Sequence, residues 1–113
     1  DPLSPTLLYE FTETTEVHDV YVRDNVAFIN AANTYGLQVY YFLNSSNPTK
    51  LSSFYDYEDF GYNHSGWLNE DGSIYVFADE TPGKRLKLCK FNECISPSLI
   101  STFCLSNNFP DKL

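Results

Sequence analysis

The chain has 113 residues, enough for one small domain, and 42% of them are hydrophobic and 17% aromatic, which is ample for a packed core. Its formal net charge of -8 argues against nucleic-acid binding, because a cationic surface is needed to replace phosphate counterions, and it equally disfavours an anionic membrane surface. This acidity is typical of a solvated surface that keeps a domain soluble, or of affinity for cations or basic partners.

Neither a membrane span nor a signal peptide is predicted in this piece. The sequence has no uninterrupted apolar run of about 18 residues. Residues 1–16 lack the basic start and apolar core of a signal peptide. We therefore expect no membrane insertion here, and for an exported protein the signal and anchor would lie outside this chain.

Three segments share one register and indicate an internal repeat. In each, a proline precedes a phenylalanine by six residues, and the three prolines are Pro5, Pro48 and Pro97. Their spacings of 43 and 49 residues are typical of propellers or helical arrays. Aligning the segments also pairs His18 with His64 and Gly36 with Gly83.

In chain order, residues 1–16 are predicted to form the closing strand of a preceding repeat and a linker. Residues 17–56 form the first full repeat, 57–106 the second, and 107–113 the start of a following segment. Apolar residues alternate with other residues at period two along 20–28 and 37–41, which indicates half-buried strands. Turns are predicted at Asp24-Asn25, Tyr35-Gly36, residues 45–48 and Asp71-Gly72.

The patterning predicts an all-β fold, in which each repeat has room for the four short strands of one propeller blade. The chain would then be part of a β-propeller, with two four-stranded blades plus one extra strand. Propellers usually close with about four to eight blades, so we expect the chain to associate with further blades of the same protein or with other subunits. The competing interpretation is a self-contained all-β domain of two packed sheets.

Two motifs carry a family resemblance. Residues 18–22 (HDVYV), 36–39 (GLQV) and Asn47-Pro48 resemble the LVIVD repeat, a blade-forming repeat. Residues 61–68 (GYNHSGWL), followed by 75–81 (YVFADET), resemble the secreted choice-of-anchor B proteins. The resemblance covers roughly residues 4–103 and implies a β-propeller on an exported, often surface-anchored protein. It implies no particular reaction.

Both histidines of the chain occupy equivalent repeat positions, which allows two interpretations. In the functional one, they lie at the mouth of a propeller channel and bind a divalent metal or act as acid and base. In the structural one, which their recurrence favours, each histidine orders its own blade through a hydrogen bond to a neighbouring turn. The metal-ligand candidates are His18, Asp19, His64, Asp79 and Glu80.

The segment 55–64 departs most from the repeat and interleaves acids with aromatic residues. Its carboxylates could supply oxygen ligands to calcium, and its aromatic rings could stack on a carbohydrate or grip a protein ligand. Plain packing of an acidic surface loop is the alternative. The candidate ligand-binding residues are Tyr55, Tyr57, Glu58, Asp59, Tyr62, His64 and Trp67.

Cysteines and glycosylation patterns give weaker signals. The odd number of cysteines leaves at least one of Cys89, Cys94 and Cys104 unpaired within this piece. Either a Cys89–Cys94 or a Cys94–Cys104 disulfide is compatible with the spacing, as are buried free thiols. Asn44 and Asn63 each begin an N-glycosylation acceptor pattern.

These observations predict a binding or scaffold module of an exported, cell-surface β-propeller protein. No nucleophile elbow, phosphate-binding glycine loop or zinc-helix motif is found in the sequence, which lowers the expectation of an enzyme. The alternative is a hydrolase or lyase with a channel-mouth site. That site would use His18, His64, Asp79 and Glu80, together with a divalent cation such as calcium.

Overall fold

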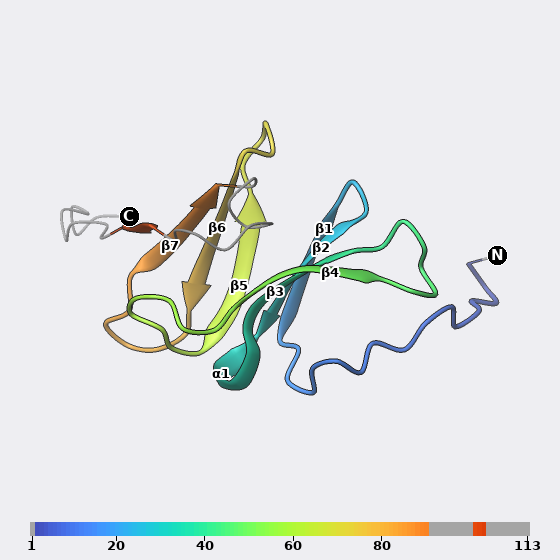
Figure 1. The fold of residues 1–113 in the computed structure, drawn as a ribbon, viewed down its shortest axis with the longest axis horizontal. Coiled ribbons are helices and arrows are strands. Elements are labelled where there is room, and N and C mark those ends of the chain that lie inside the picture. The colour runs from blue at the N-terminus through green and yellow to red at the C-terminus, as the bar shows by residue number, and fades with distance from the viewer. Residues whose placement is uncertain (1, 91–100, 104–113) are drawn as a thin grey trace.

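The computed structural model describes residues 2–90 and the backbone of residues 101–103, and these form two antiparallel four-stranded sheets (Figure 1). The all-β prediction is confirmed. In each sheet the strands are neighbours in chain order. The first sheet consists of β1 (Asp19–Arg23), β2 (Val26–Ala31), β3 (Gly36–Tyr41) and β4 (Thr49–Phe54), and the second of β5 (Asn63–Leu68), β6 (Ile74–Asp79), β7 (Leu86–Lys90) and β8 (Ser101–Phe103).

The first hairpin of each sheet turns where the sequence predicted. Asp24 and Asn25 both have positive φ angles, of 50° and 62°, as a two-residue hairpin that follows the strand twist requires. Between β5 and β6, the N–H of Gly72 donates to the Asn69 carbonyl at 3.0 Å. The Asn69 side chain accepts from the N–H of Ile74 at 2.8 Å and so closes that turn.

The connection between β2 and β3 differs from the plain turn predicted at Tyr35-Gly36. One turn of helix, α1 (Ala32–Tyr35), occupies it, and Gly36 follows with φ 60° and ψ -134°, a conformation that glycine adopts readily. A four-residue helix is too short to produce a 3.6-residue apolar pattern. Within the described residues, no helix has the length and apolar character needed to cross a membrane.

The extra strand predicted before the first repeat does not form in this structure. Residues 5–18 contain no strand, although the backbone N–H of His18 donates to the Asn30 carbonyl at 2.9 Å. Phe11 instead packs its ring edge-on against Tyr40, with centroids 4.8 Å apart. The segment predicted at residues 107–113 lies outside the described residues.

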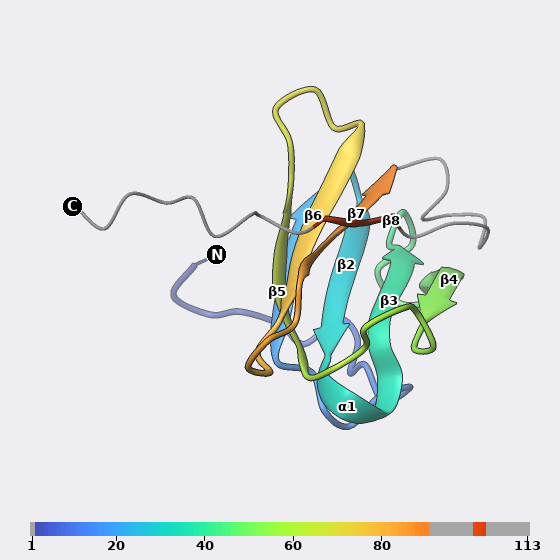
Figure 2. The ribbon, with the colours of Figure 1, turned by 90° about the vertical axis from the view of Figure 1, so that its left-hand side faces the viewer.

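The two sheets stack face to face with their strands in the same order (Figure 2). The ring of Phe28 on β2 stacks on that of Tyr75 on β6, at 4.2 Å and 13°. Asn30 donates from Nδ2 to the Tyr75 hydroxyl at 3.0 Å, and Arg23 donates to the carbonyls of Asn69 and Glu70. The hydrogen-bonded partners are 45, 46 and 47 residues apart. Each contact therefore joins a residue to one lying a repeat period later.

The main core lies between the sheets, and a smaller apolar cluster covers the opposite face of the first sheet. All six residues of β2 are buried, so this strand has neighbours on both faces. The main core contains Val26, Phe28, Leu37, Val39, Phe54, Tyr57, Leu68, Tyr75, Phe77 and Cys89. The outer cluster contains Ala27, Ile29, Ala31 and Tyr40, with Phe11, Tyr35 and Phe42 packed against it.

Replacing Gly36 by alanine should lower the free energy of unfolding by about 3 kcal/mol, from backbone strain plus a steric clash. Gly36 has φ 60°, and an added Cβ would collide with the carbonyl oxygen of Phe54. Gly83 is the matched control, because its φ is also positive, at 80°, but a Cβ there meets nothing within 4 Å. Gly83→Ala should cost only about 1–2 kcal/mol. Urea denaturation measures both, and equal losses would contradict the steric argument.

Candidate functional site

His18, His64 and Glu80 form a cluster at one end of the stacked sheets. His18 immediately precedes β1, His64 is the second residue of β5, and Glu80 directly follows β6. The two imidazole rings lie 4.2 Å apart at 40°. One ligand atom from each of the three residues lies within 4.8 Å of the others. The structure thus brings together three of the five predicted metal-ligand candidates.

One hydrogen bond, made by His18, links the cluster across the two sheets. His18 Nδ1 lies 3.2 Å from the carbonyl oxygen of His64. His64 has Ser65 Oγ at 3.1 Å from its Nδ1 and a Glu80 carboxylate oxygen at 3.3 Å from its Nε2. The Tyr62 ring meets His18 edge-on, with centroids 5.5 Å apart. His18 therefore connects the two sheets, whereas the structural interpretation expected each histidine to order its own repeat.

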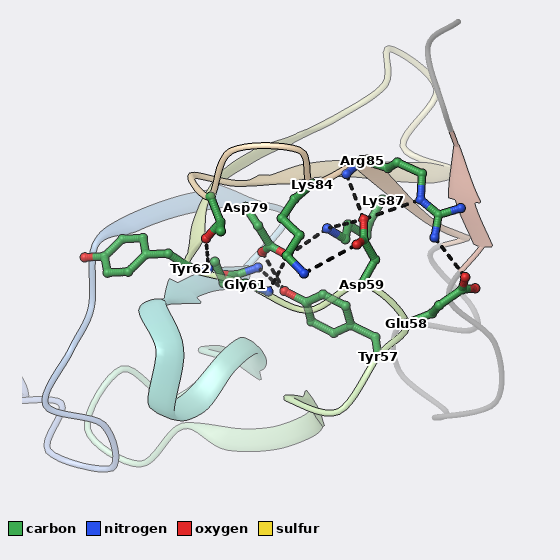
Figure 3. A network of polar contacts seen from close by, with 11 residues as sticks. Tyr57, Glu58, Asp59, Gly61, Tyr62, Asp79, Lys84, Arg85 and Lys87 are labelled. Atoms are coloured by element: carbon green, nitrogen blue, oxygen red, sulfur yellow. Dashed lines mark hydrogen bonds and ion pairs between the residues drawn. The ribbon is translucent and has the colours of Figure 1, made fainter.

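Asp79 and Asp19 are not part of this cluster. Asp79 is buried, and its Oδ2 lies 2.7 Å from Nζ of Lys87, whose side chain is fully buried as well (Figure 3). The Tyr57 hydroxyl donates to Asp79 Oδ1 at 2.7 Å, and the N–H of Gly61 donates to Oδ2 at 3.0 Å. The negative charge of Asp79 is therefore compensated inside the protein by the Lys87 ammonium. Asp19 is half-buried at the start of β1.

The Asp79–Lys87 pair is the centre of a buried polar network. Burial, together with the hydrogen bond to Asp79, raises the pKa of the Tyr57 hydroxyl well above its usual range. The Lys87 ammonium lies 5.6 Å from the centroid of the Tyr57 ring, and Asn63 donates to the Tyr57 hydroxyl at 3.2 Å. Sequence reasoning missed Lys87, since a lysine between two leucines in a strand normally faces solvent. Removing one partner of a buried ion pair strongly destabilises a protein, because the other charge then loses its nearest counter-charge.

The acidic segment 55–62 closes over the β6–β7 connection through ion pairs (Figure 3). Asp59 accepts from the backbone N–H of Arg85 at 2.9 Å and pairs with Lys84 at 3.4 Å. Glu58 pairs with the Arg85 guanidinium at 2.8 Å. The backbone N–H of Arg85, with the side chains of Arg85 and Lys84, lowers the pKa of Asp59 to about 2. Protein cations therefore occupy the positions that calcium would need at Glu58 and Asp59.

The remaining predicted ligand-binding residues separate into different places. Tyr62 adjoins His18, and Tyr57 is buried in the network. Tyr55 and Trp67 are 61% and 69% exposed, and the Trp67 ring lies 4.5 Å from that of Tyr21. The predicted set therefore does not form one continuous binding surface.

Two other predictions meet the structure at Asn63 and Cys89. Asn63 is fully buried, which is incompatible with glycosylation there in the folded protein, whereas Asn44 is exposed. Cys89 is buried and disulfide-bonded, so it is not a free thiol. Cys94 and Cys104 lie outside the described residues, and the pairing stays open.

An apolar groove of about 420 Å³ lies on the face of the first sheet that points away from the second sheet. Val17, Val20 and Val22 border it with 43%, 44% and 60% of their surface exposed. Other described residues therefore cover these valine side chains only in part. The groove is lined by Phe11, Val17, Val20, Val22, Ala27, Ile29 and Phe42.

Comparisons of the chain with protein-family models, with curated proteins and with solved structures found no match. The resemblance to LVIVD-repeat and choice-of-anchor B proteins therefore stays a prediction from the motifs.

Replacing Asp79 by asparagine should cost about 3 kcal/mol of unfolding free energy, because the buried Lys87 ammonium loses the carboxylate at 2.7 Å and keeps only Asp59, at 3.9 Å, as an ion-pair partner among the described residues. The control is Asp24→Asn, since the Asp24 side chain is 93% exposed and its ion pair with Arg23 is long, at 3.8 Å. That change removes the same charge and should cost less than about 1 kcal/mol. Guanidinium denaturation of both variants gives the comparison. Similar losses in the two variants would show that the Asp79 pair is not tightly coupled to folding.

Asp59 should contribute stability that disappears in acid. Its pKa in the folded state, about 2, is below the ordinary 3.8, so the contribution is fully present above about pH 4. Between pH 3.8 and 2 the Asp59 carboxylate binds a proton in the unfolded chain but stays ionised in the folded chain. Its contribution to stability is therefore lost as the pH falls through this range. Urea denaturation of the parent and of Asp59→Asn should therefore give free energies of unfolding that differ at pH 6. That difference should become smaller as the pH is lowered to 2.5. A difference independent of pH would contradict this role of the Asp59 carboxylate.

Proposed function

We propose that this chain forms two adjacent blades of a β-propeller, and that the propeller acts as a binding or scaffold module of an exported, cell-surface protein. The observation that supports this most strongly is the similar sequence separation of several contacts between the sheets. Asn30, Arg23 and Phe28 each pack against a residue 45 to 47 positions later. Neighbouring blades are related by one rotation, so equivalent positions meet in this way.

The relative placement of the sheets supports blades that radiate from an axis. Among the described residues, the most extensive close backbone approaches between strands of the two sheets join β1 and β2 to β5. The sheets are thus nearest at their first strands. In a propeller the first strands of neighbouring blades line the central channel, which gives the same pattern.

The apolar groove on the first sheet favours a propeller over a self-contained pair of sheets. In a two-sheet domain the outer faces are solvated and carry polar side chains, whereas β2 is apolar and buried on both faces. Val20 and Val22 remain partly exposed on that outer face. The occupant we propose is a further sheet of the same kind, because the opposite face of the first sheet already accepts one.

The disulfide at Cys89 supports the export part of the proposal, because disulfides persist mainly in oxidising compartments. The ligand class proposed for the module is a carbohydrate or a protein. The exposed rings of Tyr55 and Trp67 offer rigid aromatic area of the type such ligands contact.

The isolated 113-residue chain should have a solution mass above its own 13.0 kDa, because the groove on the first sheet lacks its blade. Light scattering measures this directly. Replacing Val20 and Val22 by threonine should reduce the association while preserving strand propensity. The control is Leu43→Thr, because Leu43 is 72% exposed and does not line the groove.

A folded 13.0 kDa monomer with one sharp thermal transition would overturn the two-blade proposal. It would favour the self-contained domain of two packed sheets. If the Val20→Thr/Val22→Thr variant associates as strongly as the parent, the chains associate through another surface. That result would contradict the proposed blade interface.

A further inference from the structure

We propose that His18, His64 and Glu80 bind a divalent transition-metal ion of the zinc class, with water completing the coordination sphere. The three residues offer two imidazole nitrogens and one carboxylate oxygen within 4.8 Å of one another. Three protein ligands and an open position are the arrangement of zinc sites that keep a water ligand. All three residues belong to this chain, so the inference does not depend on the propeller proposal.

The distances fit a small ion at one edge of the site. Zinc–nitrogen and zinc–oxygen bonds of about 2.0–2.1 Å place two ligand atoms of a tetrahedron roughly 3.3–3.4 Å apart. His64 Nε2 and the Glu80 carboxylate oxygen are 3.3 Å apart. One ring nitrogen of His18 lies within 4.8 Å of the other two ligand atoms, so a movement of this side chain must bring its ligating nitrogen to the same spacing. His18 is exposed and precedes β1, so its side chain has room for that movement.

The hydrogen bond made by His18 leaves it ready to act as a ligand. A backbone carbonyl only accepts hydrogen bonds, so the contact between His18 Nδ1 and the His64 oxygen at 3.2 Å places a proton on Nδ1. In the neutral ring the lone pair is then on Nε2. Metal-binding histidines commonly donate their other ring N–H to such a carbonyl, which orients the ring and raises its basicity.

His64 can offer Nε2 to a metal ion, because this nitrogen lies 3.3 Å from the Glu80 carboxylate oxygen. A neutral imidazole carries one proton, so a metal ion at Nε2 requires that proton to be on Nδ1, which lies 3.1 Å from Ser65 Oγ. The serine hydroxyl accepts that hydrogen bond and keeps the ring oriented, so Ser65 is a positioning residue for His64.

The ligand chemistry selects the ion class and departs from the calcium prediction. Calcium takes six to eight oxygen ligands, whereas imidazole nitrogen suits zinc, copper and nickel. The site offers only one carboxylate, and its side chain is 66% exposed, so water has access. The formal net charge of -8 favours the approach of any cation, but the imidazole pair discriminates among them.

Isothermal titration of the oxidised 113-residue chain with zinc chloride, after removal of bound metal by a chelator, tests the proposal. We expect one saturable site for zinc and none for calcium chloride. With cobalt, we expect the absorption spectrum of a tetrahedrally coordinated ion. Glu80→Gln, His18→Gln and His64→Gln should each weaken zinc binding at least about tenfold. The loss of even a hydrogen-bond partner of a ligand typically weakens metal binding about 10- to 100-fold.

Glu70→Gln is the matched control for Glu80→Gln, because Glu70 is an exposed acid outside the cluster and the charge change is the same. It should leave zinc affinity unchanged. Glu80 is exposed, so its variant should fold even where a histidine variant does not, which circular dichroism checks. Absence of saturable zinc binding by the parent chain, or affinity that is equal in the parent and Glu80→Gln, would overturn the proposal.

Discussion

The stacking of Phe28 on Tyr75 is the contact on which the rest of the arrangement depends. It joins β2 to β6 through the main core, and Asn30 fixes the Tyr75 hydroxyl by donating a hydrogen bond to it. Gly66 leaves the space that this hydroxyl occupies, since a Cβ there would collide with the Tyr75 ring and hydroxyl. With the sheets held at this separation, the chain before β1 lies beside β5, and His18 meets His64. The candidate metal site is therefore a result of how the sheets pack.

Much of the strand pattern could be predicted from the sequence, because it depends on local chemistry. Alternating apolar residues determined the strands on both sides of Asp24-Asn25, and these two residues tolerate the positive φ angles of the hairpin turn. The helix α1 and the burial of Lys87 could not be predicted in this way. The helix is a single turn with no apolar period of its own, and the buried Lys87 takes its counter-charges from elsewhere in the chain, from Asp79 at 2.7 Å and Asp59 at 3.9 Å.

The candidate site was predicted in part, and its error has a geometric cause. The repeat alignment paired His18 with His64, and the structure brings their rings together. The sequence prediction places Asp79 and Glu80 in one site, but successive residues at a strand end point to opposite faces. Asp79 shares the inward face with Tyr75 and Phe77 and joins Lys87, so only Glu80 reaches the histidines. The period-two rule along 74–80 places the two carboxylates on opposite faces of the strand.

The similar sequence separation of several contacting residues also bears on how such a chain can lengthen. Phe28 packs on Tyr75, 47 positions later, and Asn30 reaches the same tyrosine 45 positions on, so one repeat serves as the template for the next. A tandem duplication of one repeat in the gene would present the same apolar faces in the same order. The new copy would dock without evolving a new interface, and insertions would be tolerated in the loops while the strands kept their register.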